Sequence, residues 1–225
     1  MTVSTERVGW RFSWGRAGTV VTLSLGALAF WVRPSAPAPD ALEPLMLNEI
    51  LADPARDWNG DGITHFRDDE WVEIVNVGIS PVTLDGYRLA GADTSWRYGF
   101  SGTLAPGAEL VVYGSQSYAW ETANGTPRFG LRLNNTGGTI GLWRLSDIDT
   151  VRVDSYTYTD HEADPDRSTG RIPDGGGLWR VFDALNPYTG IALPLGTGCM
   201  PSPGGPFLCP TLVRHETWGG LKRKY

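Results

Sequence analysis

Residues 70–77 read EWVEIVNV, and this stretch decides the fold class. Val72 and Ile74 share one face of an extended segment, whereas Glu73 points to the opposite face. This alternation of β-branched and polar residues is typical of a strand in an antiparallel sheet. A charged residue in the middle of such a strand usually faces solvent, so we expect Glu73, and Glu49 in the preceding run, to be exposed. The alternative for both is a carboxylate that supports the following loop or an ion.

Short apolar runs of the same kind lie on both sides of this stretch, separated by turn-forming residues such as Pro106-Gly107. Strands spaced roughly 8 to 12 residues apart are typical of a sandwich or barrel. The sequence after residue 44 shows no sustained helical periodicity, and Asp85-Gly86 inside one run predicts a β-bulge. The predicted strands are Leu45–Leu51, Trp71–Val77, Val82–Leu89, Trp96–Phe100, Glu109–Tyr113, Phe129–Leu133, Thr139–Leu145, Val151–Tyr158 and Leu178–Phe182.

The first 38 residues have the composition of an export segment. Arg7, Arg11 and Arg16 precede a run without charge, residues 17–32, and a Pro/Ala-rich stretch follows it. This apolar run is near the border between a signal-peptide core and a spanning helix. We therefore expect a hydrophobic N-terminal helix in residues 1–38 that is either a cleaved signal peptide or an anchor with the body outside. The alternative is a helix buried in a core.

Net charge argues against one class of partner. The chain carries a formal charge of −6, and four of its arginines lie in residues 1–38, so the remaining body is more acidic still. Proteins that bind nucleic acid need a basic surface for the phosphate backbone. We therefore expect no nucleic acid as the main partner.

The chain contains two cysteines, Cys199 and Cys209, which lie close together near the C-terminus. In an exported protein they most simply form one local disulfide, and two free thiols are the alternative. They belong to a segment rich in Pro and Gly, residues 196–225, which we expect to be a tail that follows a sandwich domain of residues 45–195.

The sharpest local motif lies between the first two predicted strands. Its oxygen-bearing residues follow the spacing of a calcium loop, with Gly62 at the sixth position for the sharp turn. The alternative is a polar loop in which Asn-Gly and Asp-Gly serve only as turns. The ligands that the pattern predicts for a structural Ca²⁺ are Asp57, Asn59, Asp61, Ile63 through its carbonyl oxygen, and Asp68.

Catalytic motifs have little support in the sequence. A second acidic cluster, residues 160–166 (DHEADPD), could serve metal binding or acid/base chemistry, but a solvated loop is the simpler interpretation. His65, His161 and His215 are far apart in the sequence. The chain has no G-x-S-x-G elbow, no H-E-x-x-H pair and no phosphate loop, so hydrolase or nucleotide chemistry lacks a specific motif.

Seven short motifs lie between residues 45 and 190. They are Asn48-Glu49-Ile50, Glu70–Asn76, Val82–Leu89, Leu104–Gly107, Leu133–Gly138, Val153-Asp154 and Arg171–Gly175. They occur in the order found in the lamin-tail domain family, so the chain resembles an exported, bacterial-type member of that family. The resemblance implies an immunoglobulin-like antiparallel β-sandwich and a domain without catalytic activity. Residues Leu185–Gly190 depart from the P-G-x-x-N sequence with which such domains usually end. The resemblance therefore does not define the last strand of the domain.

These observations predict an extracellular or cell-envelope protein that is a non-catalytic interaction or structural module with a structural calcium loop. Its expected partner is a protein or an envelope polymer, and an uncleaved N-terminal segment would add contact with the membrane. The main alternative is a metal-dependent extracellular hydrolase that uses the acidic loops. A purely structural envelope protein is a third interpretation.

Overall fold

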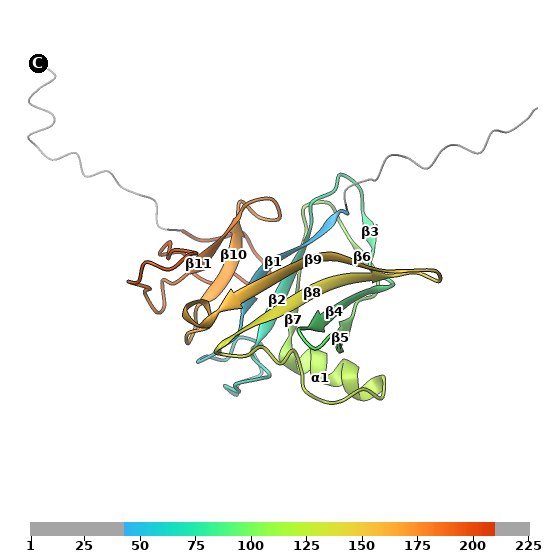
Figure 1. Cartoon of the computed structure of the whole chain (residues 1–225), viewed down its shortest axis with the longest axis horizontal. Helices are drawn as coiled ribbons and strands as arrows, with labels where there is room; N and C mark the ends of the chain where they lie inside the picture. The colour runs from blue at the N-terminus through green and yellow to red at the C-terminus, as the bar shows by residue number, and fades with distance from the viewer. Residues whose placement is uncertain (1–42, 210–225) are drawn as a thin grey trace, which may run out of the picture. The chain divides into compact units, whose positions relative to one another are not determined.

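The computed structural model describes residues 43–209. In this part of the chain the strands form antiparallel sheets in two layers (Figure 1), so the predicted immunoglobulin-like sandwich is confirmed. The hydrophobic helix expected in residues 1–38 and the last part of the predicted tail lie outside the described residues. Within residues 43–209, no helix is both long and apolar enough to cross a membrane.

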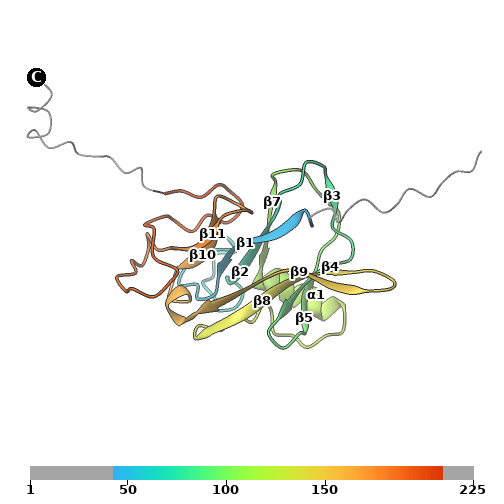
Figure 2. The same ribbon diagram turned by 45° about the horizontal axis from the view of Figure 1, so that its top comes forward.

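Two large sheets make up the layers, and Figure 2 shows them apart from one another, with the helix beside the four-stranded one. The five-stranded sheet has the order β11 (Leu178–Phe182), β10 (Ser168–Ile172), β1 (Leu45–Leu51), β2 (Trp71–Asn76) and β7 (Glu109–Tyr113). The four-stranded sheet has the order β5 (Trp96–Gly99), β4 (Tyr87–Gly91), β8 (Gly137–Leu145) and β9 (Thr150–Thr159). The remaining elements are the short pair β3 (Val82–Thr83) and β6 (Thr103–Leu104), the helix α1 (Gly114–Ala123) and the 3₁₀ turn η1 (Asp160–Glu162).

The inner faces of the two large sheets enclose an apolar core. Leu47 of β1, Ile74 of β2, Leu89 of β4 and Ile140 of β8 belong to it and have no exposed surface. Full burial of one such aliphatic side chain stabilises a fold by about 1.5–3 kcal/mol. The apolar alternation visible in the sequence therefore supplies the contacts that hold the layers together.

The outer face of the five-stranded sheet is buried as well, which corrects one expectation. A register shift between Leu47 and Glu49 turns Glu49 onto this outer face, opposite Glu73. Both acids were expected to face solvent, yet their exposed fractions are 1% and 0%. The backbone N–H of Ser202 donates to Glu49 at 3.2 Å and that of Gly204 donates to Glu73 at 2.6 Å. A segment more than a hundred residues away in the sequence thus covers the face that carries these acids.

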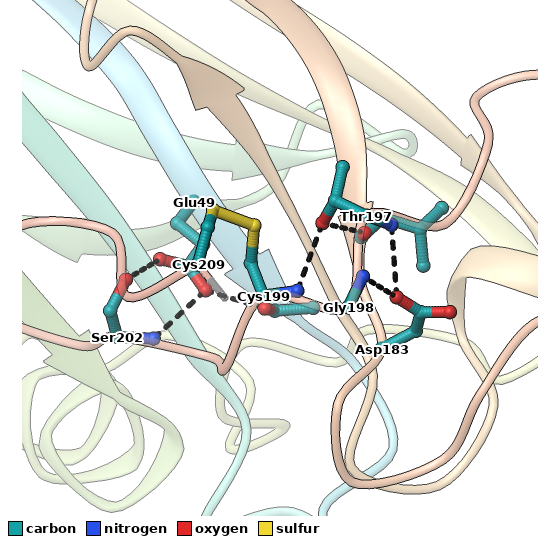
Figure 3. Close-up of a disulfide and its surroundings, with 9 residues drawn as sticks. Glu49, Asp183, Thr197, Gly198, Cys199, Ser202 and Cys209 are labelled. Carbon is teal, nitrogen blue, oxygen red and sulfur yellow. Dashed lines mark hydrogen bonds between the residues drawn. A yellow bond between two sulfur atoms is a disulfide. The ribbon is translucent and has the colours of Figure 1, made fainter. Parts of the chain in front are cut away.

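We call this covering segment, residues 196–209, the C-terminal strap (Figure 3). Cys199 and Cys209 are joined by a disulfide within it. Its first part is fixed to the sandwich through Asp183, which accepts the backbone N–H groups of Thr197 at 3.0 Å and Gly198 at 2.7 Å. Residues 196–209, expected to be a tail, therefore pack against the sandwich.

Two local predictions are wrong, and both concern the same region. The sequence predicted no helix after residue 44, but α1 buries small or charged residues such as Ser117 and Glu121, so it carries no apolar periodicity. The predicted strand Phe129–Leu133 is irregular. The backbone N–H groups of Phe129 and Gly130 donate to the Glu121 carboxylate, at 2.6 and 2.8 Å, rather than to a neighbouring strand.

The predicted run Val82–Leu89 forms two strands instead of one. Asp85-Gly86 makes a turn between β3 and β4 and not a bulge, with the Tyr87 N–H donating to the Leu84 carbonyl at 3.0 Å. Gly86 has a φ of +90°, a left-handed conformation that favours glycine. β10 was not predicted, although the sequence around Arg171 suggested a turn at its end.

Candidate functional site

The loop between β1 and β2 is organised around Asp57. Its carboxylate accepts the backbone N–H groups of Gly60 at 2.8 Å, Asp61 at 3.1 Å and Gly62 at 2.7 Å. Gly60 and Gly62 have φ values of +75° and +90°, which residues with a side chain adopt rarely. The glycines of the predicted calcium motif therefore fold the chain around the first predicted ligand.

Three of the five predicted ligands lie together. Asp57 and Asn59 both accept the N–H of Asp61, at 3.1 and 2.9 Å, so their oxygens are neighbours. The Asn59 amide donates to the Asp61 carboxylate at 3.3 Å. Carboxylate and amide oxygens in such a group are the donors that Ca²⁺ prefers. The first half of the loop thus fits the chemistry of the predicted ion.

The structure also shows contacts of the other two predicted ligands. The Asp68 carboxylate lies 3.3 Å from the imidazole of His65. Ile63 is 65% exposed, and its N–H donates to Asp61. In the part of the chain that the structure describes, no three His, Cys, Asp or Glu side chains are grouped as metal ligands. The loop therefore brings together Asp57, Asn59 and Asp61, and the Asn59 amide donates to the backbone carbonyl oxygen of Asp68 at 3.4 Å.

Asp69 fixes the base of the same loop, a role that the sequence did not reveal. It has no exposed surface, and its carboxylate accepts the N–H groups of Trp58 at 2.8 Å, Asn59 at 3.0 Å and His65 at 2.7 Å. A buried carboxylate that accepts three backbone donors satisfies amides that would otherwise be unpaired. The loop is thus held in shape by an acid immediately after the predicted motif.

The second acidic cluster, residues 160–166, is not the solvated loop that the sequence suggested. Asp166 is buried, and it accepts the Trp58 indole N–H at 2.9 Å and the Arg56 guanidinium at 3.0 Å. Glu162 is also buried and accepts the hydroxyl of Thr169 at 3.0 Å. These acids connect the β1–β2 loop and β10 to the rest of the sandwich.

A polar crevice lies beside this loop, where the β4–β5 turn approaches the segment that precedes β8. It consists of two hollows of about 170 and 230 Å³, which share Arg132 and Asn134. Asp93, Arg97 and Tyr158 also line the smaller hollow, whereas Phe66, Arg67 and Glu70 also line the larger one. We call this pair of hollows the arginine crevice. It brings together residues that the sequence analysis did not single out.

Arg97 is the buried cation of the smaller hollow, with only 2% of its surface exposed. One of its terminal nitrogens donates to Asp93 at 2.7 Å, and the other lies 3.4 Å from the buried carboxylate of Glu121. Within residues 43–209, its Nε–H has no hydrogen-bond partner. A buried donor of this kind is normally paired, so this nitrogen is an exception that lies beneath the surface of the hollow.

Glu70 is the corresponding acid of the larger hollow and is 3% exposed. Burial raises its pKa well above the ordinary value, although the backbone N–H groups of Leu133 and Arg132 oppose this shift. Its Oε2 has no hydrogen-bond partner among the described residues. Each hollow of the arginine crevice therefore contains one buried polar atom that this part of the protein leaves unpaired.

Comparison with known proteins gives one match. A family model described as Lamin Tail Domain matches residues 38–160, which is more than half of the chain. No curated protein and no solved structure matches the chain. The matched region contains β1 to β9, the β1–β2 loop and the arginine crevice, whereas β10, β11 and the C-terminal strap follow it.

Proposed function

The chain belongs to the lamin tail domain family, and from this membership we propose that it is an exported interaction module that binds its partner at the arginine crevice. The observation that carries the proposal is the arginine crevice itself, two adjoining polar hollows that share Arg132, with the exposed Phe66 lining the larger one. Arginine and aromatic side chains gathered at a hollow are typical of surfaces that bind partners.

The non-catalytic character of the module is supported by what its buried acids do. Asp69 and Asp166 accept hydrogen bonds from loop backbone groups and a neighbouring arginine, and Glu49 and Glu73 bind the C-terminal strap. These carboxylates act on the protein itself and stabilise its loops. We therefore propose that the partner is a protein or an envelope polymer that the module binds without hydrolysing it.

We propose further that the β1–β2 loop is a structural calcium clip. The support is the grouping of Asp57, Asn59 and Asp61 within the spacing of a calcium loop. Residues 57–68 also carry Phe66, whose ring is 61% exposed and lines the larger hollow. An ion that orders this loop would hold Phe66 beside the crevice, which connects the clip to partner binding.

The export proposal rests on the N-terminal segment and is in keeping with the disulfide. Residues 1–38 have the charge and apolar pattern of a signal peptide or anchor. Disulfides such as that between Cys199 and Cys209 persist mainly in oxidising compartments. We propose a location outside the cell or in the cell envelope, with membrane contact if the N-terminal segment is retained.

Retention of envelope material on the immobilised full-length chain tests the proposed binding surface. The variants Phe66→Ala and Arg132→Ala change exposed or half-exposed side chains of the crevice, so the fold should persist. Ile148→Ala, at a residue 95% exposed between β8 and β9, is the matched control. We expect both crevice variants to lose most of the retained material and the control to keep it. Equal retention by all four proteins would reject the crevice as the binding surface.

A further inference from the structure

The outer face of the four-stranded sheet carries a row of large side chains that the proposed function does not use. Arg88 of β4 is paired with Trp143 of β8, and Trp143 is paired in turn with Arg152 of β9. Residues paired directly across neighbouring strands present their side chains on the same face of a sheet. Leu89 and Leu142, the chain neighbours of the first two, belong to the core, so the row faces away from it.

Each arginine of this row lies over a tryptophan ring. The guanidinium of Arg152 is 5.9 Å from the ring centre of Trp143. The guanidinium of Arg88 is 5.6 Å from the ring centre of Trp120 in α1. Trp96 of β5 approaches Trp143 edge to face, with 6.2 Å between the ring centres. Cations at such distances are attracted to the faces of indole rings, which orients both guanidiniums in the tryptophan–arginine face, as we call these five residues.

Carboxylates do not neutralise this face within residues 43–209. Arg88 is half-buried and Arg152 is exposed, and neither forms an ion pair with a described residue. The strands β4, β5, β8 and β9 contain one acid, Asp154, whose carboxylate accepts the N–H of Leu47 in the other sheet. The chain as a whole has a net charge of −6. A locally positive surface on an acidic protein favours a partner that carries negative charge.

The aromatic rings give this face an apolar surface between its two charges. Trp143 is half-buried and stands between Arg88 and Arg152 in the row. A Cβ atom at Gly141 would lie 2.8 Å from the Trp143 indole nitrogen, so this ring extends along the sheet over the glycine. A ligand that matches the face therefore combines negative groups with apolar ones.

Protein segments that carry both carboxylates and apolar side chains have this combination. One carboxylate accepts two parallel hydrogen bonds from a guanidinium, and tryptophan and arginine are prominent among the residues that supply the binding energy of protein interfaces. A nucleic acid would instead bring many phosphates to two arginines on a protein with a net charge of −6. We propose that the tryptophan–arginine face binds an acidic, partly apolar segment of a protein. Its five residues lie outside the two hollows of the arginine crevice, so this inference goes beyond the proposed binding surface and does not depend on it.

An NMR titration of the full-length chain tests this proposal. The probes are the peptide GELELEG, its neutral counterpart GQLQLQG, the acidic glycan polygalacturonate and a short oligothymidylate. The face variant Arg88→Gln/Arg152→Gln removes both charges of the face. Arg128→Gln/Arg180→Gln is the matched control, because it changes the net charge equally and its two arginines also form no ion pair within residues 43–209.

We expect GELELEG to shift the amide signals of Arg88 and Arg152 and the indole signals of Trp120 and Trp143. Its affinity should be at least about tenfold weaker in the face variant and unchanged in the control. Equal shifts with GQLQLQG, or larger shifts with polygalacturonate or oligothymidylate, would overturn the proposal. So would the absence of any shift up to about 10 mM of GELELEG. Sedimentation of the chain alone adds a further test, since self-association that the face variant abolishes would assign this surface to a second copy instead.

Discussion

Glu49 of β1 and Glu73 of β2 are paired across adjacent strands, and the C-terminal strap closes over both. Burial is the main cause that raises their pKa values, to about 8 for Glu49 and about 7 for Glu73. The proximity of Glu73 adds to the shift of Glu49, and Glu109 and Asp174 add to that of Glu73. Two acids that prefer the protonated state therefore lie under the segment that attaches the C-terminal end to the sandwich.

The stability of the fold should decrease as pH rises through this range. Above the ordinary glutamate pKa of 4.5 the unfolded chain loses these protons, whereas the folded chain keeps them up to about pH 7 on Glu73 and about pH 8 on Glu49, so rising pH favours unfolding. We expect the free energy of unfolding to fall by on the order of a few kcal/mol between about pH 5 and about pH 8. Denaturant titrations at several pH values measure the free energy of unfolding. In the double variant Glu49→Gln/Glu73→Gln its decrease with pH should be much smaller. An equal slope in that double variant would contradict the assignment.

Loss of the disulfide should release the strap. The variant Cys199→Ser/Cys209→Ser removes a cross-link that spans 10 residues, and cross-links of this length contribute on the order of 2–3 kcal/mol. The amides of Ser202 and Gly204, which donate to Glu49 and Glu73, should then exchange hydrogen faster. Hydrogen exchange resolved by residue measures this effect. Unchanged protection at both amides would show that the strap is held without the cross-link.

The buried ion pair between Arg97 and Glu121 should be essential for the fold near the crevice. Glu121 also accepts the N–H groups of Phe129 and Gly130, so Glu121→Ala leaves three donors, two of them buried, without this acceptor. Removal of one partner from a buried pair costs about 3–5 kcal/mol. Thr122→Ala, at the exposed neighbour in α1, should change stability by less than about 0.5 kcal/mol. Chemical denaturation compares the two variants, and similar effects would refute this role of Glu121.

Calcium should stabilise the chain if the β1–β2 loop is a clip. An ion present at about 100 times its dissociation constant adds about 2.7 kcal/mol of stability, so an excess of chelator should lower the melting midpoint by several degrees. Asp57→Ala should remove the difference between the two conditions, because Asp57 is the first predicted ligand and the centre of the loop. A midpoint that does not respond to saturating chelator in the unmodified chain would exclude the clip.

Strands that follow a regular alternation were predictable from the sequence. Leu45–Leu51, Glu109–Tyr113 and Leu178–Phe182 have the predicted bounds, because local apolar patterns and turn residues define them. α1 was not predictable in this way, since it follows β7 directly and buries Ser117 and Glu121 instead of an apolar stripe. Local pattern thus defines the strands, and tertiary hydrogen bonds define this helix.

The burial of Glu49 illustrates a second limit. Its partner Ser202 lies 153 positions away, and nothing in the local alternation shows that a distant segment covers the outer face. The calcium-type loop was visible because the candidate ligands of such a loop have a fixed spacing within one segment. The arginine crevice was not, since Glu70, Arg97 and Arg132 come from separate parts of the chain. An arginine between Trp96 and Tyr98 in a short strand was the one local signal that could have directed attention to it.

Hydrogen exchange of the full-length chain, with and without the envelope material that it retains, tests the central claim most directly. An interaction module that binds at the arginine crevice predicts new protection in residues 66–70, 91–97 and 132–139, with the bound material recovered intact. Protection confined to other surfaces, such as β11, or the recovery of cleaved material would contradict the account.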